Sequence, residues 1–419
     1  MAAGGAGGAG KALGMAAGCH PPVLRLAMHP SGSPLPTRTP HLPGALRPRR
    51  LAQAGLYAGA FLGPFGGGIT IAMLPELGAS FGVSAGVATA SVTAYLVPFA
   101  ALMLVSGTLG ERWGRRRTVV LAYVGYVVAS VGCALAPTFA VFLGARALQG
   151  AANAFTTPLL LAALGSAAAP DRIGRALGWF ASLQALGQAS APLVGGLAAE
   201  LDWRLAFAGA ALAALLLAMA GIPDQERAPD APPARLRTAL RPRVLRLGLV
   251  SAVGWACLSG LGFLVALRLE EAFGVGAAQR GLVLTGMGVV GLLSARLVGA
   301  FIDRAGARRC VLLGAGLGAG LVLGIGLAPA PAVVTVLWAA GGIATQLVLV
   351  GVNAIVLVAG AANRGGTMSV VQAVRFGGGA LAPAVVTPLY AVAPVAGFVL
   401  PALLLALVVP LALPAEPPG

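Results

Sequence analysis

Long, uninterrupted runs of apolar residues fill the sequence between Leu51 and Leu413. About twelve of these runs are long enough to cross the hydrocarbon core of a bilayer, which takes roughly 20 residues in a helix. Lipid offers the backbone no hydrogen-bonding partner, and the runs lack the alternation of barrel strands, so only helices satisfy their amide groups. We therefore predict an all-α integral membrane fold with twelve transmembrane helices, at approximately 55–76, 84–108, 118–136, 139–164, 174–199, 205–222, 247–267, 279–301, 309–328, 332–360, 367–391 and 393–412.

The net charge of +16 would also suit a nucleic-acid-binding protein, but the positions of the 28 Lys and Arg residues favour a membrane protein. Twenty-two of them lie in the N-terminal tail or in the loops on one side of the predicted bundle. Three lie in loops on the other side and three within predicted spans: Arg204, Arg268 and Arg280, and Arg146, Arg296 and Arg375. This asymmetry follows the positive-inside rule. We therefore expect both termini in the cytoplasm, a bacterial inner-membrane location and no nucleic-acid partner.

A fixed offset of 192 residues aligns landmarks in the two halves of the chain. Phe81-Gly82-Val83 recurs as Phe273-Gly274-Val275, and Leu135-Ala136-Pro137 recurs as Leu327-Ala328-Pro329. The repeat predicts two pseudo-symmetric six-helix bundles, a plan in which the substrate binds between the halves near the membrane midplane. The boundaries that we expect are a disordered cytoplasmic tail over 1–50, a first half over 51–222, a cytoplasmic linker over 223–245, a second half over 246–413 and a cytoplasmic tail over 414–419.

Residue types that bind metals or carry out catalysis form no recognisable site in the sequence. All three histidines fall in the first fifty residues, and the four cysteines have neither metal-ligand nor redox spacing. No nucleophile and base occur as a pair, and no phosphate-binding glycine-rich loop is present. We expect no enzyme activity, no metal, no cofactor and no ATP-driven pumping within this chain.

The loop after the second predicted span has a counterpart in the second half at the same offset. The first loop contains Gly107, Glu111, Arg112, Gly114 and Arg116, and the second contains Gly299, Asp303, Arg304, Gly306 and Arg308. An acid at a span end can pair with arginine or with the N-terminus of a facing helix, while glycine permits a tight turn. The spacing therefore predicts a conserved geometry of turn and charge on one side of both bundles.

The first loop resembles the signature loop of the major facilitator superfamily, with Glu111 where that family has aspartate. The resemblance implies a twelve-helix transporter that works by alternating access, and a gating role for this loop. We carry that role to Glu111, Arg112, Asp303 and Arg304. The alternative is that these arginines only set the membrane topology.

The fourth predicted span carries a stripe of polar residues. Arg146, Gln149, Asn153 and Thr157 follow the spacing of one helix face, and Arg146-x-x-Gln149-Gly150 looks like an Arg-x-x-Gln-Gly motif of the same family. An arginine at the centre of a span costs about 2.5–3.5 kcal/mol on insertion scales, so it usually faces a cavity or a partner. We expect the stripe to line the central cavity, with Arg146 in coupling or anion attraction. A purely structural arginine is the alternative.

The fifth predicted span contains Gly178, Gly187, Ala191-Pro192 and Gly195-Gly196. These residues resemble the antiporter motif that marks export exchangers in the superfamily, with Ala191 in place of a glycine. Gly187, Ala191 and Gly195 share one helix face, where small residues let another helix approach closely, and Pro192 removes a backbone hydrogen bond. Ordinary glycine and alanine packing is the alternative.

The tenth and eleventh predicted spans offer weaker polar candidates. Gln346 and Asn353 share one face of the tenth span, and Gln372 and Arg375 share one face of the eleventh. Together with Tyr95, Trp255 and Phe263 they suit a site with apolar walls and a few polar groups, for an amphipathic or a cationic-to-neutral organic solute.

Acidic residues avoid the middle of every predicted span, which conflicts with a simple scheme of proton antiport. The nearest candidate is Glu76 at the end of the first span, followed by Glu111 and Asp303. Proton antiport through Glu76, a proton carried by the substrate and facilitated diffusion all remain open.

These features together predict a secondary transporter that exports small organic or drug-like molecules. Uptake or facilitated transport of a sugar or metabolite is the second hypothesis, and a membrane sensor or scaffold that transports nothing is the third. The expected partners are a small-molecule substrate, the lipid bilayer and protons, and we expect a monomer.

Overall fold

Helices make up the fold, and no strand occurs among the residues that the structure describes. The computed structural model describes residues 46–167, 173–222, 241–359 and 364–414. The predicted tail over 1–50, linker over 223–245 and tail over 414–419 lie outside this part of the chain except at their edges. Within the described ranges, the all-helical membrane fold predicted from the sequence is confirmed.

All twelve predicted spans have a helical segment in the structure. Nine segments of the described chain are long and apolar enough to cross a bilayer. The shorter apolar helices Arg204–Ala220 and Ala396–Ala412 take the places of the sixth and twelfth predicted spans. The 29-residue helix α8 (Ile173–Leu201) takes the place of the fifth.

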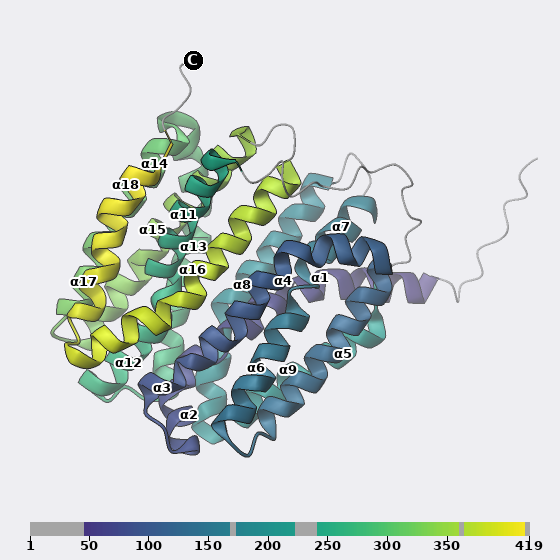
Figure 1. Cartoon of the computed structure of the whole chain (residues 1–419), viewed down its shortest axis with the longest axis horizontal. Coiled ribbons are helices and arrows are strands. Elements are labelled where there is room, and N and C mark those ends of the chain that lie inside the picture. Colours follow the sequence, from purple (N-terminus) through teal and green to yellow (C-terminus); the bar gives the residue numbers. More distant parts are fainter. Residues whose placement is uncertain (1–45, 168–172, 223–240, 360–363, 415–419) are drawn as a thin grey trace, which may run out of the picture. The chain divides into compact units, whose positions relative to one another are not determined.

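Figure 1 shows the helices in chain order. The first half contains α1 (Leu46–Gly68), η2 (Ile71–Met73), α2 (Leu74–Phe81), α3 (Ala85–Ala88), α4 (Ala90–Trp113), α5 (Arg115–Ala134), α6 (Phe139–Asn153), α7 (Thr157–Ala167), α8 and α9 (Arg204–Ala220). The second half contains α11 (Pro242–Cys257), η3 (Ser259–Leu261), α12 (Gly262–Phe273), α13 (Ala277–Ala305), α14 (Ala307–Leu327), α15 (Pro331–Ala359), α16 (Arg364–Val392), α17 (Ala396–Leu403), the π-helical η4 (Leu404–Val408) and α18 (Val409–Ala412).

The first span of each half is broken near the same end. α1 stops at Gly68 and the chain continues through η2 into α2, and α11 likewise continues through η3 into α12. Figure 1 shows α2, α3 and α12 together at the lower end of the bundle, which we call the α2 end. The opposite end, where Gly114 joins α4 to α5 and Gly306 joins α13 to α14, is called the motif end.

Glycines with positive φ mark corresponding turns in the two halves. Gly82 and Gly274 follow α2 and α12 with φ of 67° and 62°, and Gly114 and Gly306 have φ of 89° and 86°. Only glycine adopts such angles without steric strain. The 192-residue offset seen in the sequence is therefore also an offset between matching backbone conformations.

Long helices hold each half together and also join the halves. α8 packs along α1, and α16 packs along α11. Across the halves, α8 packs along α13 and α16 packs along α4, so the two seams are related in the same way as the two halves. Large apolar side chains such as Leu201, Leu293 and Leu297 remain exposed, as expected of surfaces that face lipid.

Candidate functional site

A polar network lies inside the first half, on the side of α6 that contacts α1, α4 and α5. Arg146 and Gln149 are completely buried and Asn153 is 3% exposed. The Arg146 Nη1 donates to Gln149 Oε1 and, at 3.1 Å, to the carbonyl oxygen of Gly66 in α1. The Gln149 Nε2 donates to the hydroxyl of Ser130 in α5 at 2.8 Å. Three helices are therefore tied together through one arginine and one amide.

Aromatic rings complete the surroundings of the Arg146 guanidinium group. Its central carbon lies 4.4 Å from the centre of the Tyr95 ring and 5.8 Å from that of Phe207. Its Nε lies 3.5 Å from the carbonyl oxygen of Ser91, while its Nη2 has no partner in the described chain. Carbonyl dipoles, an amide oxygen and two π faces thus hold this charge, and no carboxylate of the described chain pairs with it.

Asn153 extends the network by one helical turn. Its Nδ2 donates to the Tyr95 hydroxyl at 2.7 Å and to the carbonyl oxygen of Gly63 at 3.2 Å. The Asn153 Oδ1 accepts a hydrogen bond from the Thr156 hydroxyl at 2.8 Å. Buried amides need such partners, because an unpaired polar group in an apolar interior is costly.

The predicted stripe is partly different in the structure. α6 ends at Asn153 and α7 begins at Thr157, so the regular helical spacing stops before the fourth residue of the stripe. Thr157 nonetheless stays close to Gly63, which also contacts Asn153. Arg146 and Gln149 are enclosed by the packing of the first half in this conformation rather than open to a cavity. Their role in coupling remains a prediction.

The corresponding positions of the second half carry no such network. At the 192-residue offset, Trp338 stands in place of Arg146, Gly341 in place of Gln149 and Thr345 in place of Asn153. The Trp338 indole Nε1 donates to the carbonyl oxygen of Leu284 in α13 at 3.1 Å. The Thr345 hydroxyl is buried without a partner in the described chain.

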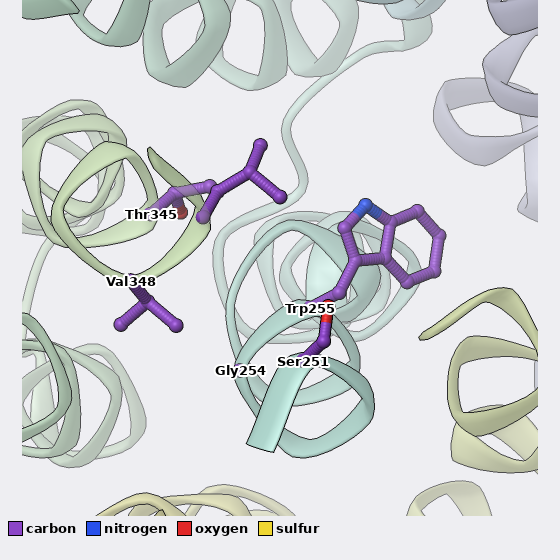
Figure 2. Close-up of a pocket in the computed structure, with 6 residues that line it drawn as sticks. Ser251, Gly254, Trp255, Thr345 and Val348 are labelled. Atoms are coloured by element: carbon purple, nitrogen blue, oxygen red, sulfur yellow. The ribbon is translucent and has the colours of Figure 1, made fainter. Parts of the chain in front are cut away.

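A small cavity of about 10 Å³ lies between α11 and α15, beside Thr345. Figure 2 shows the indole of Trp255 on one side of this space and the side chain of Thr345 on the other. The lining residues are Ser251, Gly254, Trp255, Thr345, Val348 and Leu349. A volume of this size is close to the minimum for one water molecule. The second half therefore leaves space where the first half has a filled network.

The other polar candidates of the second half lack partners in the described chain. Asn353 Oδ1, Gln372 Oε1 and Arg375 Nε are all buried without a hydrogen bond there. Gln346 is half-buried and lies against Gly291 of α13. These residues come from α15 and α16, as the sequence predicted.

Aromatic residues beside Arg375 connect the two halves. The Phe376 ring meets the Phe99 ring of α4 edge-on at 5.0 Å, and it meets the Trp255 ring of α11 at 5.4 Å. The Arg375 guanidinium carbon lies 4.7 Å from the centre of the Phe376 ring. Of the three aromatic candidates, Trp255 lines the cavity, Tyr95 belongs to the α6 network, and Phe263 is completely buried in α12.

One face of α8 packs against α1 with almost no space between the backbones. A methyl group at Gly187 would lie 2.2 Å from the carbonyl oxygen of Phe61. A methyl group at Gly195 would lie 2.1 Å from the carbonyl oxygen of Ile69, the residue that follows α1. Ala191, midway between them, is completely buried. The small residues predicted to form one face therefore do face another helix, and that helix is α1.

The neighbouring face of α8 packs against α13 of the second half. A methyl group at Gly196 would lie 2.3 Å from the carbonyl oxygen of Ala277, and one at Gly281 would lie 2.4 Å from that of Pro192. Gly178 lies in the first turns of the same helix. The motif residues thus serve two seams, one within the first half and one between the halves.

The signature loops adopt the turn that their glycines permit, with positive φ at Gly114 and Gly306. Arg112, Arg116, Asp303 and Arg304 are exposed at the motif end, and Arg308 is half-buried with its Nε unpartnered in the described chain. Within that part of the chain, no ion pair joins Asp303 to a basic residue. The side chain of Glu111 lies outside the described set. The gating role of these loops remains a prediction.

An ion pair joins the two halves at the α2 end. Arg280 of α13 is 1% exposed, and its Nη2 lies 2.5 Å and 2.7 Å from the carboxylate oxygens of Glu76 in α2. Its Nε donates to the carbonyl oxygen of Ala72 at 3.1 Å. Beside it, Glu200 of α8 accepts a hydrogen bond from the backbone N–H of Ala278 at 2.9 Å, in the first turn of α13. Two carboxylates of the first half thus hold the positive end of a second-half helix.

The expectation that Arg280 lies in an outer loop is wrong, because the residue is buried in the first turn of α13. Glu76 was expected only as a proton-exchanging group. Glu76 and Arg280 are 204 residues apart in the chain, so no sequence motif with a fixed spacing indicates that they form a pair. Neutral contacts form the equivalent seam between α4 and α16, where the Thr93 hydroxyl donates to the carbonyl oxygen of Ala380 at 2.8 Å.

Comparison with known proteins places this arrangement in a family. The Major Facilitator Superfamily profile matches residues 56–383. The drug efflux pump JefA of Mycobacterium tuberculosis is 38% identical over 119 residues, which cover 28% of this chain and 23% of that protein. The probable actinorhodin transporter of Streptomyces coelicolor is 32% identical over 165 residues, which cover 38% of this chain and 28% of that protein. The chain thus spans about a quarter of the length of these curated relatives.

A solved structure shares the fold over most of both chains. It is the inward-facing, unoccupied structure of a bacterial homolog of the human lysosomal transporter Spinster, with a TM-score of 0.68 and 16% sequence identity. The alignment covers 87% of this chain and 95% of that one. The helical fold, the repeated turns and the profile match together show that this chain belongs to the major facilitator superfamily of membrane transporters.

Proposed function

We propose that this chain is a secondary transporter that works by alternating access and exports small organic, drug-like molecules. The proposal places it in a bacterial inner membrane as a monomer. Both termini lie in the cytoplasm in this proposal, as the distribution of basic residues predicts. Alternating access in this fold moves one half against the other around a site between them.

The observation that carries the proposal is the packing of α8. Its small residues contact the backbone of α1 through one face and that of α13 through the next, so the helix belongs to both seams. The sequence of this helix resembles the antiporter motif of export exchangers in the superfamily. The name of one relative, a drug efflux pump, supports the same direction of transport.

For the coupling ion we propose the proton, with Glu76 as the group that exchanges it. Its side chain is 30% exposed and it engages Arg280 of the other half, so a change in its charge acts directly on the contact between the halves. A pH jump across proteoliposomes that contain the purified protein tests this point. Substrate flux that ignores the imposed proton gradient would eliminate antiport and leave facilitated diffusion.

A drug susceptibility and accumulation screen in an efflux-deficient host tests the export function. The panel includes anionic, neutral and cationic compounds, and it compares wild type with Arg146→Ala and Pro192→Ala. Gly209→Ala is the matched control, because a methyl group there meets nothing within 4 Å. Export predicts lower accumulation of some compounds with wild type and with the control, and loss of this effect in the other two variants. A flat profile at normal membrane expression would overturn the proposal.

A further inference from the structure

Buried positive charge without buried negative charge distinguishes the interior of this bundle. Arg146, Arg280 and Arg375 are buried at 0%, 1% and 8% exposure, whereas no Asp or Glu is buried in the described chain. Arg280 pairs with the half-exposed Glu76 at the α2 end. The other two guanidinium groups have no carboxylate partner among the described residues. Such charges are costly to keep in an apolar interior unless something compensates for them.

Arg146 is compensated by its own half. Carbonyl oxygens, the Gln149 amide and two aromatic rings surround it, and it is completely enclosed. This arrangement leaves no room for a ligand at the guanidinium group. These contacts explain structurally how the charge of Arg146 is held.

Arg375 has no comparable set of partners. Its Nε is buried without a hydrogen-bond partner in the described chain. The centre of the Phe376 ring lies 4.7 Å from its guanidinium carbon. One turn earlier on α16, the Gln372 Oε1 is also buried and unpartnered. Two adjacent polar groups in the same helix thus lack the partners that buried groups normally have.

The surroundings of Arg375 are aromatic and belong to both halves. Phe376 contacts Phe99 of the first half and Trp255 of the second, and Trp255 lines the small cavity beside Thr345. The unpaired cation therefore lies next to an aromatic wall at the seam where this family binds its substrates. Aromatic faces pack against planar apolar molecules, and a guanidinium group binds a carboxylate through two parallel hydrogen bonds.

We propose that Arg375 is the anion-binding group of the substrate site, and that this transporter takes organic acids with an aromatic or extended apolar body. The carboxylate or a similar acidic group of the solute binds the Arg375 guanidinium, and Phe99, Trp255 and Phe376 contact its apolar part. This inference rests on the proposed transport function and adds the charge of the substrate to it. It replaces the cationic-to-neutral solute expected from the sequence.

A binding experiment with two matched probes tests the proposal on the purified full-length chain in detergent. Naphthoate and naphthamide share the aromatic body and differ in charge, so the ratio of their affinities reports the anion site alone. The variants are Arg375→Gln and Arg375→Lys. Arg296→Gln is the control, because Arg296 is another span arginine but is exposed on α13.

Wild type is expected to bind naphthoate about ten- to a hundredfold more tightly than naphthamide, the range for one charge-assisted contact. Arg375→Gln should abolish this preference while leaving naphthamide binding unchanged, Arg375→Lys should keep part of it, and the control should keep all of it. A merely structural Arg375 would weaken both probes equally or neither. Equal affinities in wild type, no saturable naphthoate binding, or a preference that survives Arg375→Gln would each overturn the proposal.

The same probes separate this inference from the proposed export function. Selective naphthoate binding without energy-dependent export in cells would retain the anion site and reject the exporter. Export of cationic or neutral compounds only, with no naphthoate binding, would retain the exporter and reject the anion site.

Discussion

Glu76 and Arg280 form an ion pair between the two halves of the protein, at the α2 end of the bundle. The arginine side chain is 2% exposed and the glutamate side chain is 30% exposed. A conformation in which the α2 ends separate must break this pair and leave a buried cation with carbonyl partners only. The pair therefore stabilises the conformation described here relative to one that is open at the α2 end.

Glu76→Gln is expected to shift the population toward conformations that are open at the α2 end. Loss of a charge-assisted hydrogen bond costs about 1.5–3 kcal/mol, which corresponds to about a ten- to a hundredfold change in the equilibrium. Spin labels at the exposed positions Val87 and Val395 report the separation by pulsed electron resonance. The charge-swapped double variant Glu76→Arg with Arg280→Glu should restore the original distances. Unchanged distances in Glu76→Gln would show that the pair does not hold this end closed.

Gly187→Ala is expected to destabilise the contact between α8 and α1. The added methyl group would lie 2.2 Å from a backbone oxygen of Phe61, and such overpacking costs roughly 1–3 kcal/mol. Thermal unfolding of the purified protein should therefore begin at a lower temperature, and transport should fall. Gly144→Ala is the control, because a methyl group there meets nothing within 4 Å. Equal melting temperatures for the two variants would contradict the close packing of α8.

Tyr95→Phe and Tyr123→Phe are expected to differ in their effect on thermal stability. The Tyr95 hydroxyl accepts from Asn153 and donates to the carbonyl oxygen of Gly63, whereas the Tyr123 hydroxyl is buried without a partner in the described chain. Hydrogen bonds between transmembrane helices contribute about 0.6 kcal/mol on average. Tyr95→Phe should lower the melting temperature slightly, and Tyr123→Phe should leave it unchanged or raise it. The reverse order would show that the hydroxyl partners are assigned wrongly.

Gly306→Ala is expected to strain the turn between α13 and α14. Gly306 has φ of 86°, which an alanine adopts only at a cost of about 1–3 kcal/mol. The unfolding midpoint of the purified variant should therefore fall. Gly299→Ala lies within α13 where a methyl group meets nothing within 4 Å, so it should behave like wild type. Similar behaviour of the two variants would argue against strain at the turn.

The span pattern was predictable because lipid imposes it along each segment of the chain. Twelve apolar runs, the 192-residue repeat and the turn glycines are local features, and each has its counterpart in the structure. The breaks after Gly68 and Cys257 were not predicted, since both halves of each broken span remain apolar. Helical periodicity also predicted that the polar stripe of α6 extends to Thr157, whereas the helix ends at Asn153.

The features of the candidate site that could not be predicted from the sequence depend on contacts between segments that are distant in the chain. Arg146 and Arg375 look alike in the sequence, as single arginines within apolar spans. Arg146 is surrounded by carbonyl, amide and aromatic partners, whereas the Nε of Arg375 is buried without a hydrogen bond in the described chain. The difference comes from helices that lie tens of residues away along the chain, such as those of Gly66 and Phe207 beside Arg146, and so no local pattern records it.

The double contact of α8 has a mechanical consequence. Because the backbone of α8 touches one helix on one side and another helix on the next, α8 cannot tilt without displacing at least one of them. With α1 and α13 on its two sides, α8 would be the pivot for the rotation of one half over the other in the proposed alternating-access cycle. Glycine has no side chain to interdigitate at these points. The helices therefore cannot move closer together, but no side chain prevents α8 from sliding along its neighbours.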